Sequence, residues 1–308
     1  MVQTNSVNHN KILIICGPTA SGKTELAIKC AVKLNSEVIS ADSMNVYTGL
    51  DVGTAKPTNL EMEGVPHHLI DVCSPFETFS VGDYREKALP IVNRIIEDGK
   101  IPVICGGTGF YINSILYKMS YGKVSADLKT REKYFKLAEE YGNKYVYDIL
   151  KEKDFKAAEK LHYNDLKRVI RALEIIENGN KKSDICDDKT PLYDYKAFMI
   201  DVPREILYKH IDERVDKMIN NGLIEEVEVL ISKGITDKNQ CMQGIGYKEI
   251  YAYLIGNIDK ETAIDQIKLN TRHYAKRQLT FFNRQIETIK LPLDTADKNA
   301  KRIMTYYD

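Results

Sequence analysis

The stretch Lys11–Thr24, KILIICGPTASGKT, constrains the fold more than any other part of the chain. Its apolar run, Ile12–Cys16, is typical of a buried strand, and the residues that follow fit the pattern G-x-x-x-x-G-K-[ST]. A helical pattern, TELAIKCAVKL, comes directly after. A strand, a glycine-containing loop and a helix in this order direct backbone N–H groups, the positive end of the helix and Lys23 at a phosphate chain. The sequence therefore predicts a phosphate-ester site.

The residues expected to hold the phosphates are Gly17, Pro18, Thr19, Ala20, Ser21, Gly22, Lys23 and Thr24. In this motif the hydroxyl of Thr24 is also the expected protein ligand of Mg²⁺. The motif does not specify which phosphate ester binds.

Length and composition describe an ordinary globular protein with room for two domains. The chain has 308 residues, of which 43% are hydrophobic and 29% are charged, and no apolar run approaches the length of a membrane span. The polar N-terminus lacks the apolar region of a secretory signal. None of the six cysteines has C-x-x-C spacing. We therefore expect a cytoplasmic protein with reduced thiols and no zinc site.

Alternating strand and helix patterns predict an α/β fold with a parallel sheet. Ser36–Asp42 and Ile101–Cys105 are strand-like, and Phe79–Asp98 has a helical pattern with Ser80 as its expected N-cap. His67–Val72 is a further short strand candidate. Because neighbouring side chains on a strand face opposite ways, its two histidines favour structural hydrogen bonds over a shared metal.

Two polar residues follow predicted strands, at the edge where open α/β sheets bind their ligands. Asp42 ends one strand and precedes a loop that is rich in Gly, Thr and Asn and closed by Pro57. Thr108 follows the turn Gly106–Gly107 and is either a helix N-cap or part of the site. The strand before this turn does not end in the carboxylate with which P-loop ATPases and GTPases hold Mg²⁺, which counts against these hydrolases.

The middle of the chain differs in its charge and in its predicted secondary structure. Between Lys123 and Lys182 it contains 15 basic and 11 acidic residues, only helical patterns and no strand-like run. We expect a helical insertion at residues 120–194, within an α/β core formed by residues 1–119 and 195–308.

One helix of this insertion carries basic residues beside an apolar stripe. Val169 and Ile170 belong to the stripe, and Lys167, Arg168 and Arg171 share its polar flank. The pattern is compatible with a solvated helix face and with contacts to phosphate groups, and both interpretations stay open.

The C-terminal part adds a strand at Lys196–Val202 and a long helical stretch that carries Arg214 at the edge of its apolar stripe. A guanidinium there either pairs with a carboxylate or faces an anion. A glycine turn at Gln243–Lys248 precedes another helix. Asp259–Gln285 is a long helix, and the segment Lys268–Lys290 has six basic residues against one acidic residue, although the whole chain is neutral. Its interleaved aromatics fit a nucleic-acid contact or a helix core with a basic flank.

Six segments together resemble one family, the bacterial tRNA dimethylallyltransferases, also called tRNA isopentenyltransferases. The segments are GPTASGKT at 17–24, SADSMNVYTGLDVGTAKP at 40–57, PHHLID at 66–71, GGTGFY at 106–111, NDLKRVIRALE at 164–174 and QGIGYKE at 243–249. They extend over nearly the whole chain, and the segment at 40–57 is far more specific than the phosphate-binding loop.

The resemblance implies transfer of a dimethylallyl group from dimethylallyl diphosphate to N6 of adenosine 37 of tRNA, with release of diphosphate. It implies a P-loop kinase-like parallel sheet with helices on both faces, a helical insertion that grips the anticodon arm, and a helical C-terminal region. The base would be flipped into a tunnel with Asp42 as general base, Thr108 as a hydrogen-bonding group, and Arg214 beside the diphosphate. Mg²⁺, bound at Thr24, would be the cofactor.

The resemblance also implies a set of tRNA contacts in both parts of the chain. They are Asp42, Ser43, Met44, Asn45, Thr108, Arg131, Lys167, Arg168, Val169, Ile170, Arg171, Gln243, Gly244, Ile245, Gly246, Tyr247 and Lys248. We expect the protein to be a monomer and not to bind a membrane. The alternatives are a small-molecule P-loop kinase, which would share the sheet and a helical lid with arginines, and a nucleotide-dependent switch.

Overall fold

The computed structural model describes residues 10–118, 127–179, 182–184 and 188–307. The chain divides into two compact units: unit 1 is Met1–Leu116 with Leu192–Asp308, and unit 2 is Tyr117–Pro191. The insertion expected at residues 120–194 differs from unit 2 by three residues at each end. Within the described residues, no helix is both long enough and apolar enough to cross a membrane.

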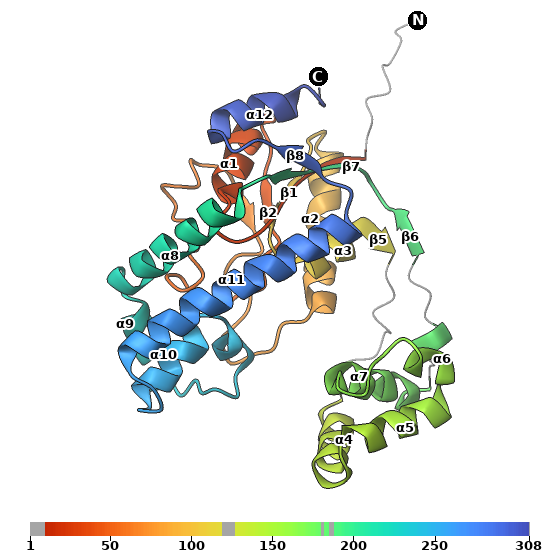
Figure 1. Ribbon diagram of the computed structural model, residues 1–308. Helices are drawn as coiled ribbons and strands as arrows, with labels where there is room; N and C mark the ends of the chain where they lie inside the picture. Colours follow the sequence, from red (N-terminus) through yellow and green to blue (C-terminus); the bar gives the residue numbers. More distant parts are fainter. Residues whose placement is uncertain (1–9, 119–126, 180–181, 185–187, 308) are drawn as a thin grey trace, which may run out of the picture. The chain divides into compact units, whose positions relative to one another are not determined.

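A six-stranded sheet forms the centre of unit 1 (Figure 1). Its order is β3 (His67–His68), β2 (Val38–Ser40), β4 (Val103–Gly106), β1 (Lys11–Cys16), β7 (Asp194–Ile200) and β8 (Ile289–Leu291). Every neighbouring pair is parallel, as the alternating pattern predicted. Residues Ile12 to Ile15 of β1 are all fully buried, so both faces of the sheet are covered.

Two helices from opposite ends of the chain share one core cluster with the sheet. These are α1 (Lys23–Lys33) and α12 (Ala296–Met304), which lie side by side (Figure 1). Leu13 and Ile15 of β1 pack in this cluster with Leu26 of α1 and Ile303 of α12. Neither β8 nor α12 was anticipated from the sequence.

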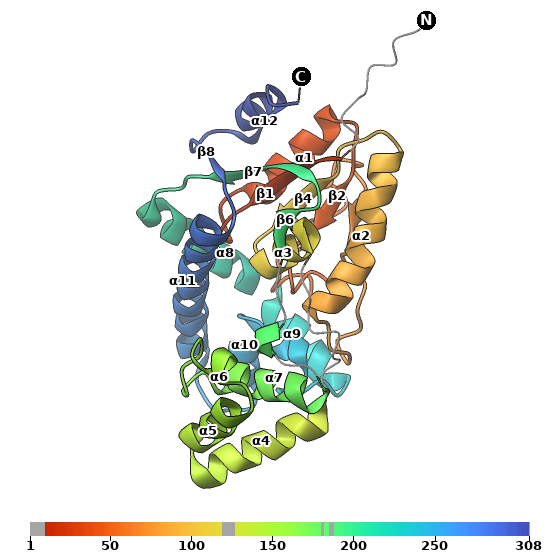
Figure 2. The same cartoon turned by 90° about the vertical axis from the view of Figure 1, so that its right-hand side faces the viewer.

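The helices α2 (Val81–Glu97) and α3 (Gly109–Leu116) also lie side by side (Figure 2). The rings of Tyr84 and Tyr111 stack between them with centroids 3.9 Å apart. The start of α2 confirms the predicted cap, because Ser80 and Asp83 bond each other's backbone N–H group in a capping box.

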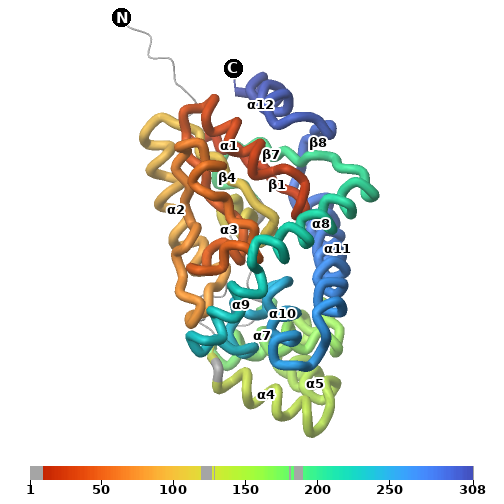
Figure 3. Tube along the Cα trace, turned by 90° about the vertical axis from the view of Figure 1, so that its left-hand side faces the viewer, coloured from red at the N-terminus to blue at the C-terminus, as the bar shows by residue number. Residues whose placement is uncertain are grey.

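The C-terminal helices of unit 1 form a further layer, with α8 (Arg204–Asn220) beside the long α11 (Lys260–Gln285) (Figure 3). The helical stretch predicted around Arg214 is two helices, since Gly222 adopts a left-handed φ of 98° between α8 and α9 (Leu223–Ser232). α10 (Tyr247–Leu254) then packs against both α9 and α11.

The basic residues of α11 are not all alike. Arg272 pairs with Asp212 of α8, and Lys268 pairs with Asp216 at 2.6 Å. The first half of the basic stretch is therefore a helix flank that holds α11 to α8. In the second half, Arg277 is exposed and has no ion pair among the described residues.

Unit 2 is mainly helical, as its sequence pattern predicted. It contains β5 (Tyr117–Lys118), α4 (Leu128–Tyr141), α5 (Asn143–Lys153), α6 (Phe155–Ala158), α7 (Leu166–Glu177), the short 3-10 helix η1 (Lys182–Asp184) and β6 (Asp188–Pro191). Glu174 is fully buried and accepts hydrogen bonds from Arg131, Arg171 and the backbone N–H of Asp127. This buried carboxylate fixes the start of α4 to α7.

Candidate active site

A cavity of about 440 Å³ lies in unit 1, where the carboxyl ends of β2 and β4 meet the start of α1. It brings together residues that are far apart in the sequence. Lys23 and Thr24 come from α1, Asp42 follows β2, Arg214 comes from α8, and Tyr274 comes from α11. Three of the predicted groups, the phosphate loop, Asp42 and Arg214, therefore share one space.

The glycine-containing loop ends at Gly22, the N-cap of α1, which has a left-handed φ of 82°. The loop is held internally, because the hydroxyl of Ser21 donates to the carbonyl of Pro18 at 2.9 Å. Within the described residues no side chain caps α1, so its first-turn N–H groups can donate to an anion.

Two cations lie beside this loop. Burial lowers the pKa of Lys23, and the nearby charge of Arg214 lowers it further. Burial also lowers the pKa of Arg214, whose Nη2 donates to the carbonyl of Thr54 at 3.1 Å. Within the described part of the chain, Arg214 has no ion pair and its buried Nε has no hydrogen-bond partner. An anion in the cavity would stabilise the charged forms of Lys23 and Arg214 and could accept a hydrogen bond from the Nε of Arg214.

Asp42 lies in the cavity wall with a carboxylate that is only partly engaged. Its Oδ1 accepts a hydrogen bond from the backbone N–H of Met44 at 2.9 Å. Among the described residues no hydrogen bond reaches Oδ2. The carboxylate can therefore accept a proton or a hydrogen bond from a bound molecule.

Thr108 lies behind this wall. Its hydroxyl accepts from the backbone N–H of Ser43 at 3.0 Å. Its carbonyl accepts from the N–H groups of Tyr111 and Ile112, so Thr108 stands at the start of α3, but within the described residues its side chain does not cap that helix. Burial raises the pKa of the Tyr274 phenol in the cavity wall to about 12. Thr108 is absent from the described residues that line the cavity, and its hydrogen bonds to Ser43 and to the carbonyl of Ala41 hold the residues on either side of Asp42 from outside.

Gln278 of α11 was not recognised in the sequence, although it joins two parts of the site. Its Oε1 accepts from the backbone N–H of Thr19 at 2.9 Å, and its Nε2 donates to the carbonyl of Gly107 at 3.0 Å. A Cβ at Gly107 would overlap this amide. The only sequence signal was its spacing of four residues from Tyr274, which puts both side chains on one helix face.

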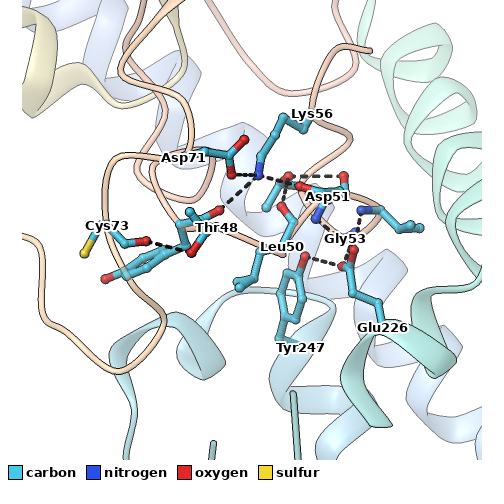
Figure 4. A network of polar contacts seen from close by, with 12 residues as sticks. Thr48, Leu50, Asp51, Gly53, Lys56, Asp71, Cys73, Glu226 and Tyr247 are labelled. Atoms are coloured by element: carbon cyan, nitrogen blue, oxygen red, sulfur yellow. Dashed lines mark hydrogen bonds and ion pairs between the residues drawn. The ribbon is translucent and has the colours of Figure 1, made fainter. Parts of the chain in front are cut away.

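The loop after Asp42 is tied down by Lys56, whose side chain is 6% exposed (Figure 4). Its Nζ lies 2.5 Å from Asp51 Oδ1 and 2.6 Å from Asp71 Oδ1, and it donates to the carbonyl of Tyr47 at 3.0 Å. The loop is therefore an ordered wall of the cavity.

The two neighbouring histidines face different surroundings. His67 lines the cavity, and its Nδ1 lies 2.8 Å from the carbonyl of Val65. His68 Nε2 lies 2.6 Å from Glu37 Oε2, and Arg94 pairs with the same carboxylate. Across the residues that the structure describes, no three His, Cys, Asp or Glu side chains gather as metal ligands would.

The tRNA contacts predicted in unit 1 lie mainly around the cavity. Ser43, Met44 and Asn45 line it, as does most of the segment Gln243–Lys248. Tyr247 is buried, however, so its ring is unavailable to a ligand at the surface.

In unit 2 the residues predicted to contact tRNA differ in burial and in their partners. Val169 and Ile170 are buried in the core of the unit, so their side chains cannot reach RNA. Arg131 and Arg171 are both bound to the buried Glu174, and their side chains stay partly exposed. Lys167 and Arg168 are exposed, although Arg168 is 3.3 Å from Asp165.

Comparisons with known proteins point to one family. The family profile described as IPP transferase matches residues 45–285. The chain is 43% identical over 305 residues to a tRNA dimethylallyltransferase of Acetivibrio thermocellus, covering 96% of this chain and 97% of that protein. It is 48% identical over 278 residues to one of Caldanaerobacter subterraneus, with 88% of each chain covered.

Two solved structures are similar over nearly the whole chain. The tRNA isopentenylpyrophosphate transferase of Bacillus halodurans is 41% identical with a TM-score of 0.72, covering 97% of this chain and 95% of that one. A eukaryotic dimethylallyltransferase acting on tRNA is 30% identical with a TM-score of 0.84, covering 96% of this chain and 77% of that one.

Proposed function

The chain belongs to the IPP transferase family, and on that basis we propose that it transfers a dimethylallyl group from dimethylallyl diphosphate to N6 of adenosine 37 of tRNA, releasing diphosphate. The observation that carries the proposal is the shared cavity of Lys23, Asp42 and Arg214. It combines cations for a diphosphate with a carboxylate for a proton.

The diphosphate would bind at the phosphate loop. The uncapped first turn of α1 supplies N–H donors, and Lys23 and Arg214 supply positive charge that no carboxylate neutralises by an ion pair within the described residues. These groups would stabilise the charge that grows on the departing diphosphate.

Asp42 would act as the general base. The target base has to leave the anticodon loop to reach a carboxylate inside the cavity, which supports base flipping. As the bond between the allyl C1 and the diphosphate oxygen breaks, its electron pair leaves with diphosphate. The N6 lone pair forms the new bond to C1, and the N6 proton goes to Asp42.

Mg²⁺ would be held by the hydroxyl of Thr24, an oxygen donor in the wall of the cavity, which leaves the free oxygen of Asp42 for the proton. When bound, Mg²⁺ would neutralise charge on the diphosphate. Few protein ligands are needed, since this ion usually binds substrate phosphates and keeps several waters.

The direct test uses Mg²⁺, labelled dimethylallyl diphosphate and tRNA that lacks the modification. We expect label in the tRNA. A parallel reaction with ATP and small acceptors tests the kinase alternative, and consumption of ATP there with unlabelled tRNA would refute the transferase.

A tRNA substrate and free thiols at the five described cysteines also support a cytoplasmic location.

We expect the double variant Lys167→Ala/Arg168→Ala to weaken tRNA binding, because these exposed cations would meet phosphate groups. The slope of log K against log salt should fall by about one for each phosphate group that the variant no longer binds. Filter binding at several salt concentrations measures both effects. The double variant Lys136→Ala/Lys156→Ala removes equal charge from other exposed positions of unit 2 as a control. Unchanged affinity and slope in the first variant would favour the solvated-face interpretation.

A further inference from the structure

Glu226 of α9 binds a turn of the loop between Asp42 and Pro57 (Figure 4). Its Oε2 accepts from the backbone N–H groups of Asp51 and Val52, both at 2.8 Å. Its Oε1 accepts from the N–H of Gly53 at 3.1 Å and from the hydroxyl of Tyr247 at 2.6 Å. An ionised carboxylate has about four acceptor sites, so this one is fully used.

Tyr247 completes the attachment. Its ring is buried, and a Cβ at Gly53 would come within 2.6 Å of it. The turn can approach this closely only because residue 53 is glycine. Glu226 and Tyr247 therefore fix the position of the turn 51–53 from two directions.

The residue after this turn contacts the proposed diphosphate site. The carbonyl of Thr54 accepts the hydrogen bond from Arg214 Nη2 at 3.1 Å, and this is the only protein hydrogen bond of that guanidinium within the described residues. A displacement of the turn would move this carbonyl and leave the guanidinium without its orienting partner.

We propose that Glu226 is a positioning residue for the allyl donor: it holds the turn 51–53 so that Thr54 orients Arg214 toward the diphosphate. This inference rests on the proposed function, because it concerns the same site. Glu226 itself would touch neither substrate.

The loop has other anchors, which makes the proposal testable. Lys56 binds Asp51, Asp71 and the carbonyl of Tyr47 without involving Glu226. Since Lys56 holds the side chain of Asp51, a change at Glu226 should shift the backbone of the turn 51–53 and Thr54 while the loop as a whole stays attached.

The variant Glu226→Gln keeps the shape of the side chain and replaces one oxygen by an NH₂ group. In one orientation of the amide, the NH₂ group would face the N–H groups of Asp51 and Val52. In the other, it would face the N–H of Gly53 and the hydroxyl of Tyr247. In either case donors oppose each other and at least one donor loses its acceptor. We expect the KM for dimethylallyl diphosphate to rise about tenfold. Tyr247→Phe, which removes one of the four hydrogen bonds, should have a smaller effect.

The matched control is Glu228→Gln, since Glu228 is exposed on the same helix and has no ion pair or hydrogen bond among the described residues. A purely structural role would lower Tm without a selective change in donor KM.

The decisive measurement is a double-mutant cycle. If Glu226 acts through Arg214, Glu226→Gln should cause no further loss in an Arg214→Ala background.

Two results would overturn the inference: a wild-type donor KM in Glu226→Gln, or an undiminished loss in the Arg214→Ala background. Calorimetry with inorganic diphosphate separates this inference from the proposed function. Suppose that the wild type transfers no dimethylallyl group and that Glu226→Gln binds diphosphate about tenfold more weakly than the wild type. The transferase function would then be refuted, and the positioning role of Glu226 would stand. Equal diphosphate binding by the wild type and Glu226→Gln would refute that role.

Discussion

Replacement of Asp42 by alanine is expected to slow the chemical step by about 10²–10⁴-fold, because the N6 proton loses its acceptor. Asp42 lies in the cavity with Lys23 and Arg214, and only one of its carboxylate oxygens accepts a hydrogen bond within the described residues. Single-turnover transfer with saturating tRNA and dimethylallyl diphosphate measures this step apart from product release. The affinity for tRNA should change far less.

Asp42→Asn separates proton transfer from the structural role of this side chain. The amide oxygen can still accept from the N–H of Met44, so the loop after β2 should keep its conformation. The asparagine cannot take up the proton, and we expect it to be nearly as slow as the alanine variant. A single-turnover rate close to the wild type in Asp42→Asn would rule out the general-base role.

The central fold was predictable because its signals are local. The apolar run of β1, the glycine loop and the start of α1 are adjacent in the sequence, so they could be interpreted together. The capping box of α2 likewise depends on residues three positions apart. In contrast, β8 has only three residues, and its pairing with β7 joins Ile289 to Phe198, which is far away in the sequence.

The same distinction applies to the site. Asp42 could be found because a strand end is visible in the sequence and because the motif around it is specific. Gln278 and Glu226 could not, because each acts on backbone groups from a distant segment. A glutamine in a basic helix or a glutamate in an acidic one carries no local sign that its partners are the N–H groups of a loop.

The side chain of Arg214 is the other place where a large effect is expected. Arg214→Ala should lower kcat/KM for dimethylallyl diphosphate by about 10²–10³-fold, as does loss of a group that stabilises developing charge in other enzymes. Steady-state kinetics with varied donor at saturating tRNA measures this effect. Arg204→Ala is a control on the same helix, because Arg204 is exposed, donates a hydrogen bond to Tyr208 and does not line the cavity.

Arg214→Lys distinguishes charge from geometry. A lysine keeps the positive charge, but it cannot reproduce the guanidinium fork that bonds Thr54 and still presents other N–H groups to an oxygen. If orientation matters, Arg214→Lys should recover only a small part of the activity that Arg214→Ala loses. Wild-type donor kinetics in Arg214→Ala would mean that the phosphate loop and Lys23 suffice for the diphosphate.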